Sequence, residues 1–195
     1  MNMKRKTSTR GFTLVEMIVA VGLFAVVMMV SVSALLALVN ANRKAQALQS
    51  VMNNLNVAID GMVRSIRMGS QYHCGASGVY TATADCSSGD TLFAFEPFHS
   101  GADAVPPWVY WFAEDQNGVG RLYKSEDGTL TGGVAMTAPE VSVDSVRFYV
   151  IGSSRGDSVQ PKVLIIIKGT AGNTKITTQS TFHIQATAVQ RILDL

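Results

Sequence analysis

One stretch constrains this chain more than any other, the apolar run from Phe12 to Leu38. Of its 27 residues, 15 are Phe, Leu, Ile or Val, three are Met and four are Ala. The remaining five are Thr13, Glu16, Gly22, Ser31 and Ser33. Because about 20 apolar residues in a helix suffice to cross a bilayer, we expect residues 12–39 to form a membrane-spanning helix.

Glu16 is the one charged residue in this run and lies near its start. Each central Phe, Leu, Ile or Val favours insertion by about 0.3–0.6 kcal/mol, whereas a central charge costs about 2.5–3.5 kcal/mol. Fifteen such residues outweigh one carboxylate, so the segment inserts despite Glu16. An ionisable group in a membrane segment indicates a functional site with a partner.

Positive charge is concentrated before the run, at Lys4, Arg5, Lys6 and Arg10. By the positive-inside rule these residues keep the N-terminus in the cytoplasm, against two opposing cations at positions 43 and 44. Beyond the first eleven residues the chain holds 12 positive and 14 negative residues, a net charge of −2. A nearly neutral domain has no direct basic footprint for nucleic acid.

The segment Arg10-Gly11-Phe12-Thr13-Leu14-Val15-Glu16, with the basic residues before it, resembles the leader and cleavage motif of type IV prepilins and pseudopilins. The resemblance implies that residues 1–11 are a leader peptide. It implies that a membrane prepilin peptidase cuts between Gly11 and Phe12 and that Phe12 is then N-methylated. It also implies that Glu16 pairs with the N-terminal amine of a neighbouring subunit in a filament. Physical chemistry supports such a pair, since an unpaired carboxylate is costly in a medium of low dielectric.

Two simpler interpretations of the N-terminus compete with this one. An ordinary secretory signal has an apolar core of about 7–15 residues, roughly half the length found here, although Val39-Asn40-Ala41 imitates its cleavage site. An unprocessed single-pass anchor for an extracytoplasmic binding protein explains the length of the run but leaves the motif from Gly11 to Glu16 unexplained.

From residue 40 the pattern becomes amphipathic without a break. Apolar residues recur in steps of four and three, at Leu48, Met52, Leu55, Ile59, Met62 and Ile66. This spacing predicts that residues 40–68 continue the helix into a globular domain and bury one stripe of it. Back-bonding by Ser31 and Ser33 is a possible cause of bending in the apolar part.

Gly69 and Ser70 end the predicted helix and open a loop that reaches Asp90. It contains both cysteines of the chain, Cys74 and Cys86. A lone pair of cysteines outside the cytoplasm favours a disulfide. A metal site would need His73 and Asp85 beside the two thiols, and the missing C-x-x-C spacing disfavours it.

The rest of the chain, within residues 69–195, has the signals of β-structure. Strands are predicted at residues 91–95, 108–112, 121–124, 141–151, 162–168 and 175–189, separated by turn-like segments. Short local connections favour one antiparallel meander packed on the helix stripe. The fold class is therefore α+β, and the resemblance implies a type IV pilin fold. The ending from Phe182 to Arg191 is similar to the last strand of minor pilins of the W-type and secretion J-type groups.

Several patterns with chemical meaning have simpler explanations. Gly152, Ser154 and Gly156 match G-x-S-x-G and are followed by Asp157 and His183, but that motif needs a helix after its turn and a strand is predicted there. The acidic segments 114–118 and 125–128 lack the spacing of a calcium loop. His73, His99 and His183 share no metal spacing. We expect no enzyme activity, no cofactor and no metal.

Four aromatic residues, Trp108, Tyr110, Trp111 and Phe112, are too close in sequence to share one face of a strand. We expect half of them in the core and the others available to a neighbouring subunit or ligand.

The resemblance implies a structural, minor subunit of a type IV pilus or of a type II secretion or competence pseudopilus. Its expected partners are prepilin peptidase, other pilin or pseudopilin subunits, an inner-membrane assembly platform and membrane lipid. It would reside in the inner membrane and later in a cell-surface or periplasmic filament.

Overall fold

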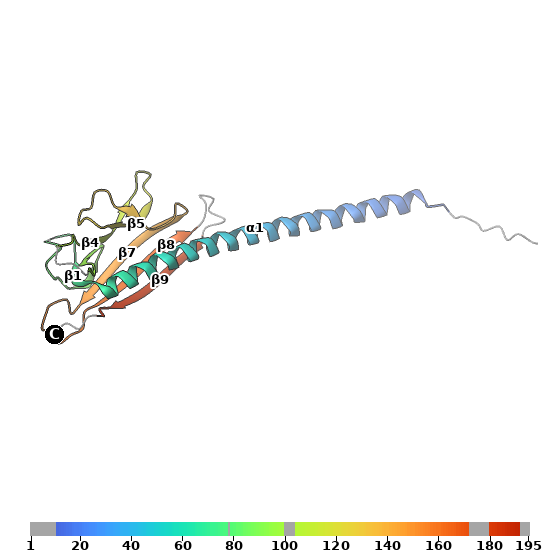
Figure 1. Cartoon of the computed structure of the whole chain (residues 1–195). Helices are drawn as coiled ribbons and strands as arrows, with labels where there is room; N and C mark the ends of the chain where they lie inside the picture. Colours follow the sequence, from blue (N-terminus) through green and yellow to red (C-terminus); the bar gives the residue numbers. More distant parts are fainter. Residues whose placement is uncertain (1–10, 78, 100–103, 172–179, 192–195) are drawn as a thin grey trace, which may run out of the picture. The chain divides into compact units, whose positions relative to one another are not determined.

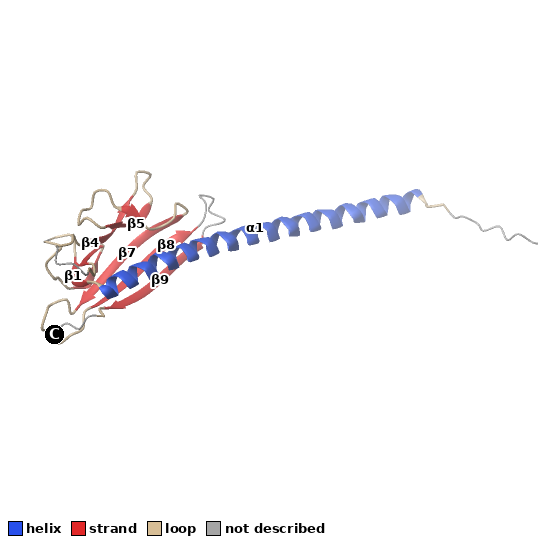
Figure 2. Ribbon diagram, in the orientation of Figure 1, coloured by secondary structure: helices blue, strands red, loops and turns tan. Residues whose placement is uncertain are grey.

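The computed structural model describes residues 11–77, 79–99, 104–171 and 180–191. The chain divides into two compact units, Met1–Arg43 and Lys44–Leu195. The elements, drawn in Figures 1 and 2, are one helix and nine strands within the described ranges: α1 (Leu14–Met68), β1 (Ser70–Cys74), β2 (Cys86–Asp90), β3 (Leu92–Glu96), β4 (Trp108–Glu114), β5 (Gly120–Ser125), β6 (Val134–Ala135), β7 (Val141–Ile151), β8 (Lys162–Ala171) and β9 (Ser180–Val189).

In the first unit, the side chains of α1 from Leu14 onward are exposed. Two hydroxyls bond back to the helix as expected: Ser31 Oγ donates to Val27 O at 2.7 Å and Ser33 Oγ to Met29 O at 2.9 Å. These bonds satisfy the serine hydroxyls within the helix itself. This part of α1 can therefore present an apolar surface without an unpaired hydroxyl.

In the second unit, the amphipathic stripe of α1 is buried as predicted. Leu55, Ile59, Met62 and Ile66 are 0–7% exposed, while Leu48 and Met52 are half-buried against the same core. The core also takes in large side chains from both sheets, including Phe93, Tyr110, Phe148 and Ile165. Figure 1 shows this part of α1 lying along the strands β7 to β9. Burying each large apolar side chain contributes about 1.5–3 kcal/mol, so the stripe holds helix and strands together.

The strands form two antiparallel sheets and not the single meander that the sequence predicted. One sheet has the order β1-β3-β4-β5-β6 and the other the order β2-β7-β8-β9. The local meanders are present, but β2 leaves its neighbours in sequence and pairs with β7, Cys86 lying opposite Val150. This pairing joins segments about sixty residues apart, which short connections could not indicate.

The predicted loop between the helix and Asp90 contains two strands that the sequence analysis missed, β1 and β2. Both are polar and neither alternates clearly, so their β-structure depends on the neighbours they pair with: β1 with β3 and β2 with β7. The strand predicted at 175–189 is observed as Ser180–Val189, and its first five residues lie outside the described ranges. The other predicted strands are present within a few residues of the expected bounds.

Tyr110 and Trp111 of the aromatic cluster are buried, whereas Trp108 and Phe112 are half-buried, so half of the cluster lies in a core as expected. Trp111 differs from Tyr110 in the core it joins. It is 8% exposed and stacks on Tyr123 with ring centroids 5.5 Å apart, in a second small core with Leu92 and Val109. A side chain at Gly133 would overlap its ring, so the loop before β6 covers this face. Both faces of β4 are therefore used within the domain.

Candidate assembly and anchoring site

The helix begins within the segment that carries the sequence motif. The backbone N–H of Glu16 donates to Thr13 Oγ1 at 3.2 Å, so Thr13 caps the first turn and Glu16 is its third residue. A Thr followed three residues later by Glu is the pattern of a capping box, a signal that our sequence analysis did not use. A carboxylate in the first turn is also favoured by the helix dipole. The local fold thus accommodates Glu16 even before any partner is considered.

Glu16 and Phe12 are exposed side chains at the start of the first unit. Phe12 is 79% exposed, Glu16 is exposed, and Glu16 has no ion-pair partner among the described residues.

The apolar side chains that follow form a continuous exposed surface. Leu14, Ile18, Leu23, Phe24 and Val30 are all more than 60% exposed. Among the described residues, α1 is the one helix long and apolar enough to cross a membrane by length and composition. Such a surface is compatible with anchoring in a membrane.

Comparison with known proteins agrees with this geometry. Residues 6–32 match the family model described as the prokaryotic N-terminal methylation motif, the hallmark of type IV prepilin- and pseudopilin-like proteins. The matched segment and the helix packed on antiparallel sheets support a type IV pilin-like protein of the kind that prepilin peptidase processes. Proteins with this motif are structural rather than catalytic. No curated protein and no solved structure matches the chain.

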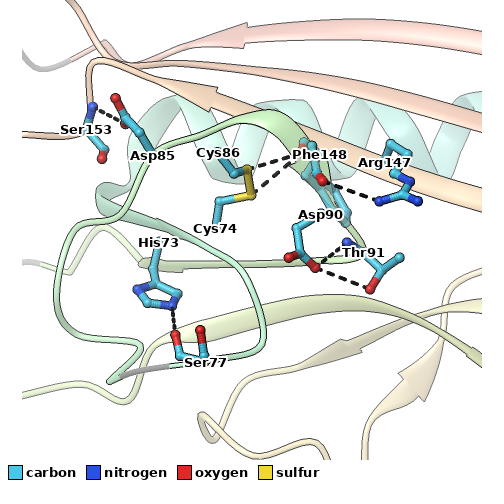
Figure 3. Close-up of a disulfide and its surroundings, with 11 residues drawn as sticks. His73, Cys74, Ser77, Asp85, Cys86, Asp90, Thr91, Arg147, Phe148 and Ser153 are labelled. Atoms are coloured by element: carbon cyan, nitrogen blue, oxygen red, sulfur yellow. Dashed lines mark hydrogen bonds between the residues drawn. A yellow bond between two sulfur atoms is a disulfide. The ribbon is translucent and has the colours of Figure 1, made fainter.

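Cys74 and Cys86 form a disulfide with their Cα atoms 5.7 Å apart, the pairing that the sequence predicted. Both sulfurs lie near Phe148 O of β7, at 3.6 and 3.3 Å. The bond therefore joins β1 to β2 directly above β7, and so it links the two sheets (Figure 3).

The residues considered as an alternative metal site, His73 and Asp85 with the two thiols, do not point toward a common position. The nitrogens of His73 lie 2.7 Å from Ala82 O and 3.1 Å from Ser77 O. Asp85 points away from the disulfide and accepts hydrogen bonds from the backbone N–H groups of Gly152 and Ser153, at 3.0 and 2.8 Å (Figure 3). Both thiols are used in the disulfide, and His73 and Asp85 bond to backbone groups in different places, His73 within its own loop and Asp85 in the turn after β7.

Asp85 has a structural role that our sequence analysis did not predict, since it considered this residue only as a metal ligand. Burial acts to raise its pKa, but the hydrogen bonds from Ser153 and Gly152 outweigh burial and hold the pKa below its ordinary value. Asp85 thus fastens the disulfide loop to the turn after β7.

The G-x-S-x-G match lies in that turn, and a strand follows it as expected. Gly152, Ser154 and Gly156 come between β7 and β8. Asp157 accepts the backbone N–H of Val159 at 2.7 Å, whereas His183 lies opposite Lys168 near the other end of β8. Lys162 begins β8 beside this turn, and Lys168 lies six positions further along the strand, about 20 Å away. The three residues of a hydrolase triad are not brought together.

The two acidic segments weighed as calcium loops are turns closed by their own side chains. Asp115 Oδ2 binds Arg121 Nε at 2.7 Å, and this bond is the first of the causes that lower the pKa of Asp115. Asp127 Oδ1 accepts bonds from the backbone N–H and the hydroxyl of Thr129 and from Ser125 Oγ, which holds the pKa of Asp127 at about 2.

Proposed function

We propose that this protein is a structural subunit of a type IV pilus or of a type II secretion or competence pseudopilus. The observation that carries the proposal is the methylation motif at residues 6–32, which opens a helix with exposed apolar side chains. Prepilin peptidase cuts between Gly11 and Phe12 and leaves Phe12 as an N-methylated terminus. The Phe12–Val39 segment anchors the subunit in the inner membrane and then becomes part of the core of a filament.

In the filament, the carboxylate of Glu16 pairs with the Phe12 amine of a neighbouring subunit. The support is chemical: Glu16 is exposed, lies one turn from Phe12, and would otherwise be an unpaired charge among apolar side chains. Buried polar groups can set the register of packed helices, and here the pair sets the stagger between subunits. Contacts that repeat without closing build a filament.

The protein is oriented with its N-terminus in the cytoplasm and its domain outside. The basic leader supports this orientation, and the disulfide fits an oxidising compartment. The likeness of the C-terminal strand to those of minor pilins favours a minor subunit, which other pilins and an inner-membrane assembly platform would accompany. The work of such a subunit is assembly, without a catalytic step.

The mass of the membrane-extracted chain tests processing. With active prepilin peptidase the chain should begin at N-methylated Phe12, and without the peptidase it should retain residues 1–11. A chain that keeps its leader in both cases would instead be an unprocessed single-pass anchor for a binding protein, and the proposal would fail.

Substitution of Glu16 tests assembly separately. Glu16→Gln and Glu16→Leu should both be processed and anchored but absent from filaments, because neither offers a carboxylate to the amine. The matched control is Glu126→Gln, an exposed glutamate of the domain. Filament incorporation of Glu16→Leu at the unmodified level contradicts the pairing.

A further inference from the structure

A basic pocket lies where the end of α1 meets the end of β9. It encloses about 370 Å³ and is lined by Asp60, Val63, Arg64, Arg67, Met68 and Arg191. The backbone joins the two elements there, since Arg191 N donates to Arg67 O at 2.8 Å. Arg191 Nη1 also lies 3.9 Å from Met68 Sδ, so its side chain is turned toward the helix.

This pocket has more positive than negative charge. Arg64, Arg67 and Arg191 are exposed, and Asp60 is the single acid among the lining residues. None of the three arginines has an ion pair with another described residue. A guanidinium presents a planar fork that matches a carboxylate, so three of them around one hollow fit an acidic partner.

An acidic end lies elsewhere in the same domain, formed by Glu114, Glu140 and Asp144. All three are exposed and none has an ion pair among the described residues. Glu114 lies opposite Gly120 at the turn between β4 and β5. Gly120 is so close to Val143 O that a side chain there would meet it, so this turn lies beside the first part of β7. Arg121 is used by Asp115, and Lys168 is the one other described cation at this end of β7 and β8.

The two charged regions lie at opposite ends of the domain. Val143 marks the acidic end of β7, whereas Ile151 pairs with Lys162 near the end where β9 leads to Arg191. Ile151 lies eight positions after Val143 along β7, about 27 Å away. The helix agrees, because Asn54 Oδ1 accepts the N–H of Ala138 near the acidic end, 13 residues before Arg67.

We propose that the pocket of Arg64, Arg67 and Arg191 receives the acidic end of a second copy of this chain, so that the domains dock head to tail. This inference rests on the proposed function and adds to it the contact between domains. The complementary charges lie at opposite ends of the same domain. A contact between them therefore repeats in one direction without closing. Two adjacent copies are enough to form it.

Disulfide trapping between two differently tagged full-length chains tests the contact in membranes. One chain carries Asp60→Cys in the pocket and the other carries Asn117→Cys at the exposed tip of the β4–β5 turn. We expect a cross-linked pair, reduced about tenfold by Arg64→Glu with Arg67→Glu in the first chain. Val79→Cys, which is 67% exposed and outside both regions, replaces Asn117→Cys as the control.

Charge reversal on both sides makes the test specific. Glu114→Lys with Glu140→Lys in the second chain should also lose the cross-link, and combining the two reversed chains should restore it. Restoration distinguishes an ionic contact from a loss of folding. Cross-linking that is equal for Asn117→Cys and Val79→Cys, or that ignores both reversals, overturns the proposal.

Two other occupants give different results. If inorganic phosphate at millimolar concentration abolishes the cross-link while both reversals leave it unchanged, the pocket is an anion site and the docking proposal is wrong. If Asp194→Asn and the reversal of Arg64 and Arg67 each raise the cross-link, the pocket binds the chain's own C-terminus and the docking proposal is wrong. Loss of the cross-link in a chain that is correctly processed at Phe12 counts against this contact alone, whereas absence of processing counts against the proposed function.

Discussion

The two parts of α1 share a backbone conformation and differ in what covers their side chains. In the anchor segment, residues 14–39, apolar residues surround the helix and are exposed; Leu23 is 62% exposed. In the packing segment, residues 48–66, the apolar residues of one stripe are buried or half-buried against the domain core, and Leu55 is 1% exposed. Polar Asn, Gln, Ser and Arg residues occupy the other face of the packing segment.

This difference shows how one helix can belong to two environments. The apolar stripe of the packing segment is buried against the chain's own strands, so this segment contributes to the stability of the domain. The side chains of the anchor segment are exposed, and under the proposed function lipid or neighbouring helices cover them. A substitution should therefore act on domain stability in one segment and on insertion or assembly in the other.

The largest expected effect separates two identical substitutions. Leu55→Ala should lower the free energy of unfolding of the domain by about 2–5 kcal/mol, because it removes buried methyl groups and leaves a cavity. Leu23→Ala should leave that free energy unchanged. Denaturant unfolding of the full chain in detergent, followed by the near-ultraviolet signal of the domain, measures both. An equal loss for the two variants would contradict the division of the helix.

A charge placed in each segment should affect the anchor segment and leave the packing segment unaffected, the reverse of the expected effect on stability. Val27→Arg should disfavour membrane insertion by about 2.5–3.5 kcal/mol, since it places a cation at the middle of the apolar run. Val57→Arg, at a site 74% exposed in the packing segment, should be neutral for insertion. The fraction of chain extracted by alkaline carbonate reports insertion, and equal extraction of the two variants would show that the anchor segment does not span the bilayer.

Loss of the disulfide should affect the domain alone. Cys74→Ser with Cys86→Ser opens a loop of 12 residues and should cost about 3 kcal/mol of domain stability. Insertion of the anchor segment should not change. Thermal unfolding with and without reductant measures the first effect and carbonate extraction the second; a double variant as stable as the unmodified chain would contradict the role of the bond.

The smallest expected effect is on the pH dependence of domain stability. Because the pKa of Asp85 is lower in the folded domain than in the unfolded chain, its hydrogen bonds stabilise the domain above about pH 4. That stabilisation is lost as the pH falls through the lowered value. Asp85→Asn should therefore remove part of the acid dependence of domain unfolding, with Asp157→Asn as a control in the turn to which Asp85 bonds. Identical pH profiles for Asp85→Asn and the unmodified chain would show that the loop is held by other contacts.

Local periodicity explains why much of the fold could be predicted. A short window of residues is enough to recognise several elements: the apolar run, the stripe from Leu48 to Ile66 and the strands at 141–151 and 162–168. The disulfide was predictable because the chain has two cysteines. The strands β1 and β2 were missed because their polar residues form strands only against β3 and β7.

The candidate site divides in the same way. The motif from Gly11 to Glu16 is contiguous, so the amino-acid order alone places the proposed cleavage and pairing residues. The basic pocket could not be predicted, since it joins Arg64 and Arg67 to Arg191, more than 120 residues later. The covering of Trp111 and the fastening of Asp85 to the turn after β7 depend on similar long-range contacts.

By itself, the sequence determined the apolar span, the amphipathic continuation of the helix and the motif that opens it. These depend on composition and on spacing along the chain. Only the tertiary structure decided that the strands divide into two sheets, that the disulfide links them, and that the domain has a basic and an acidic end. Each of these needs residues far apart in sequence to meet, and the energy of such contacts exists only in the folded chain.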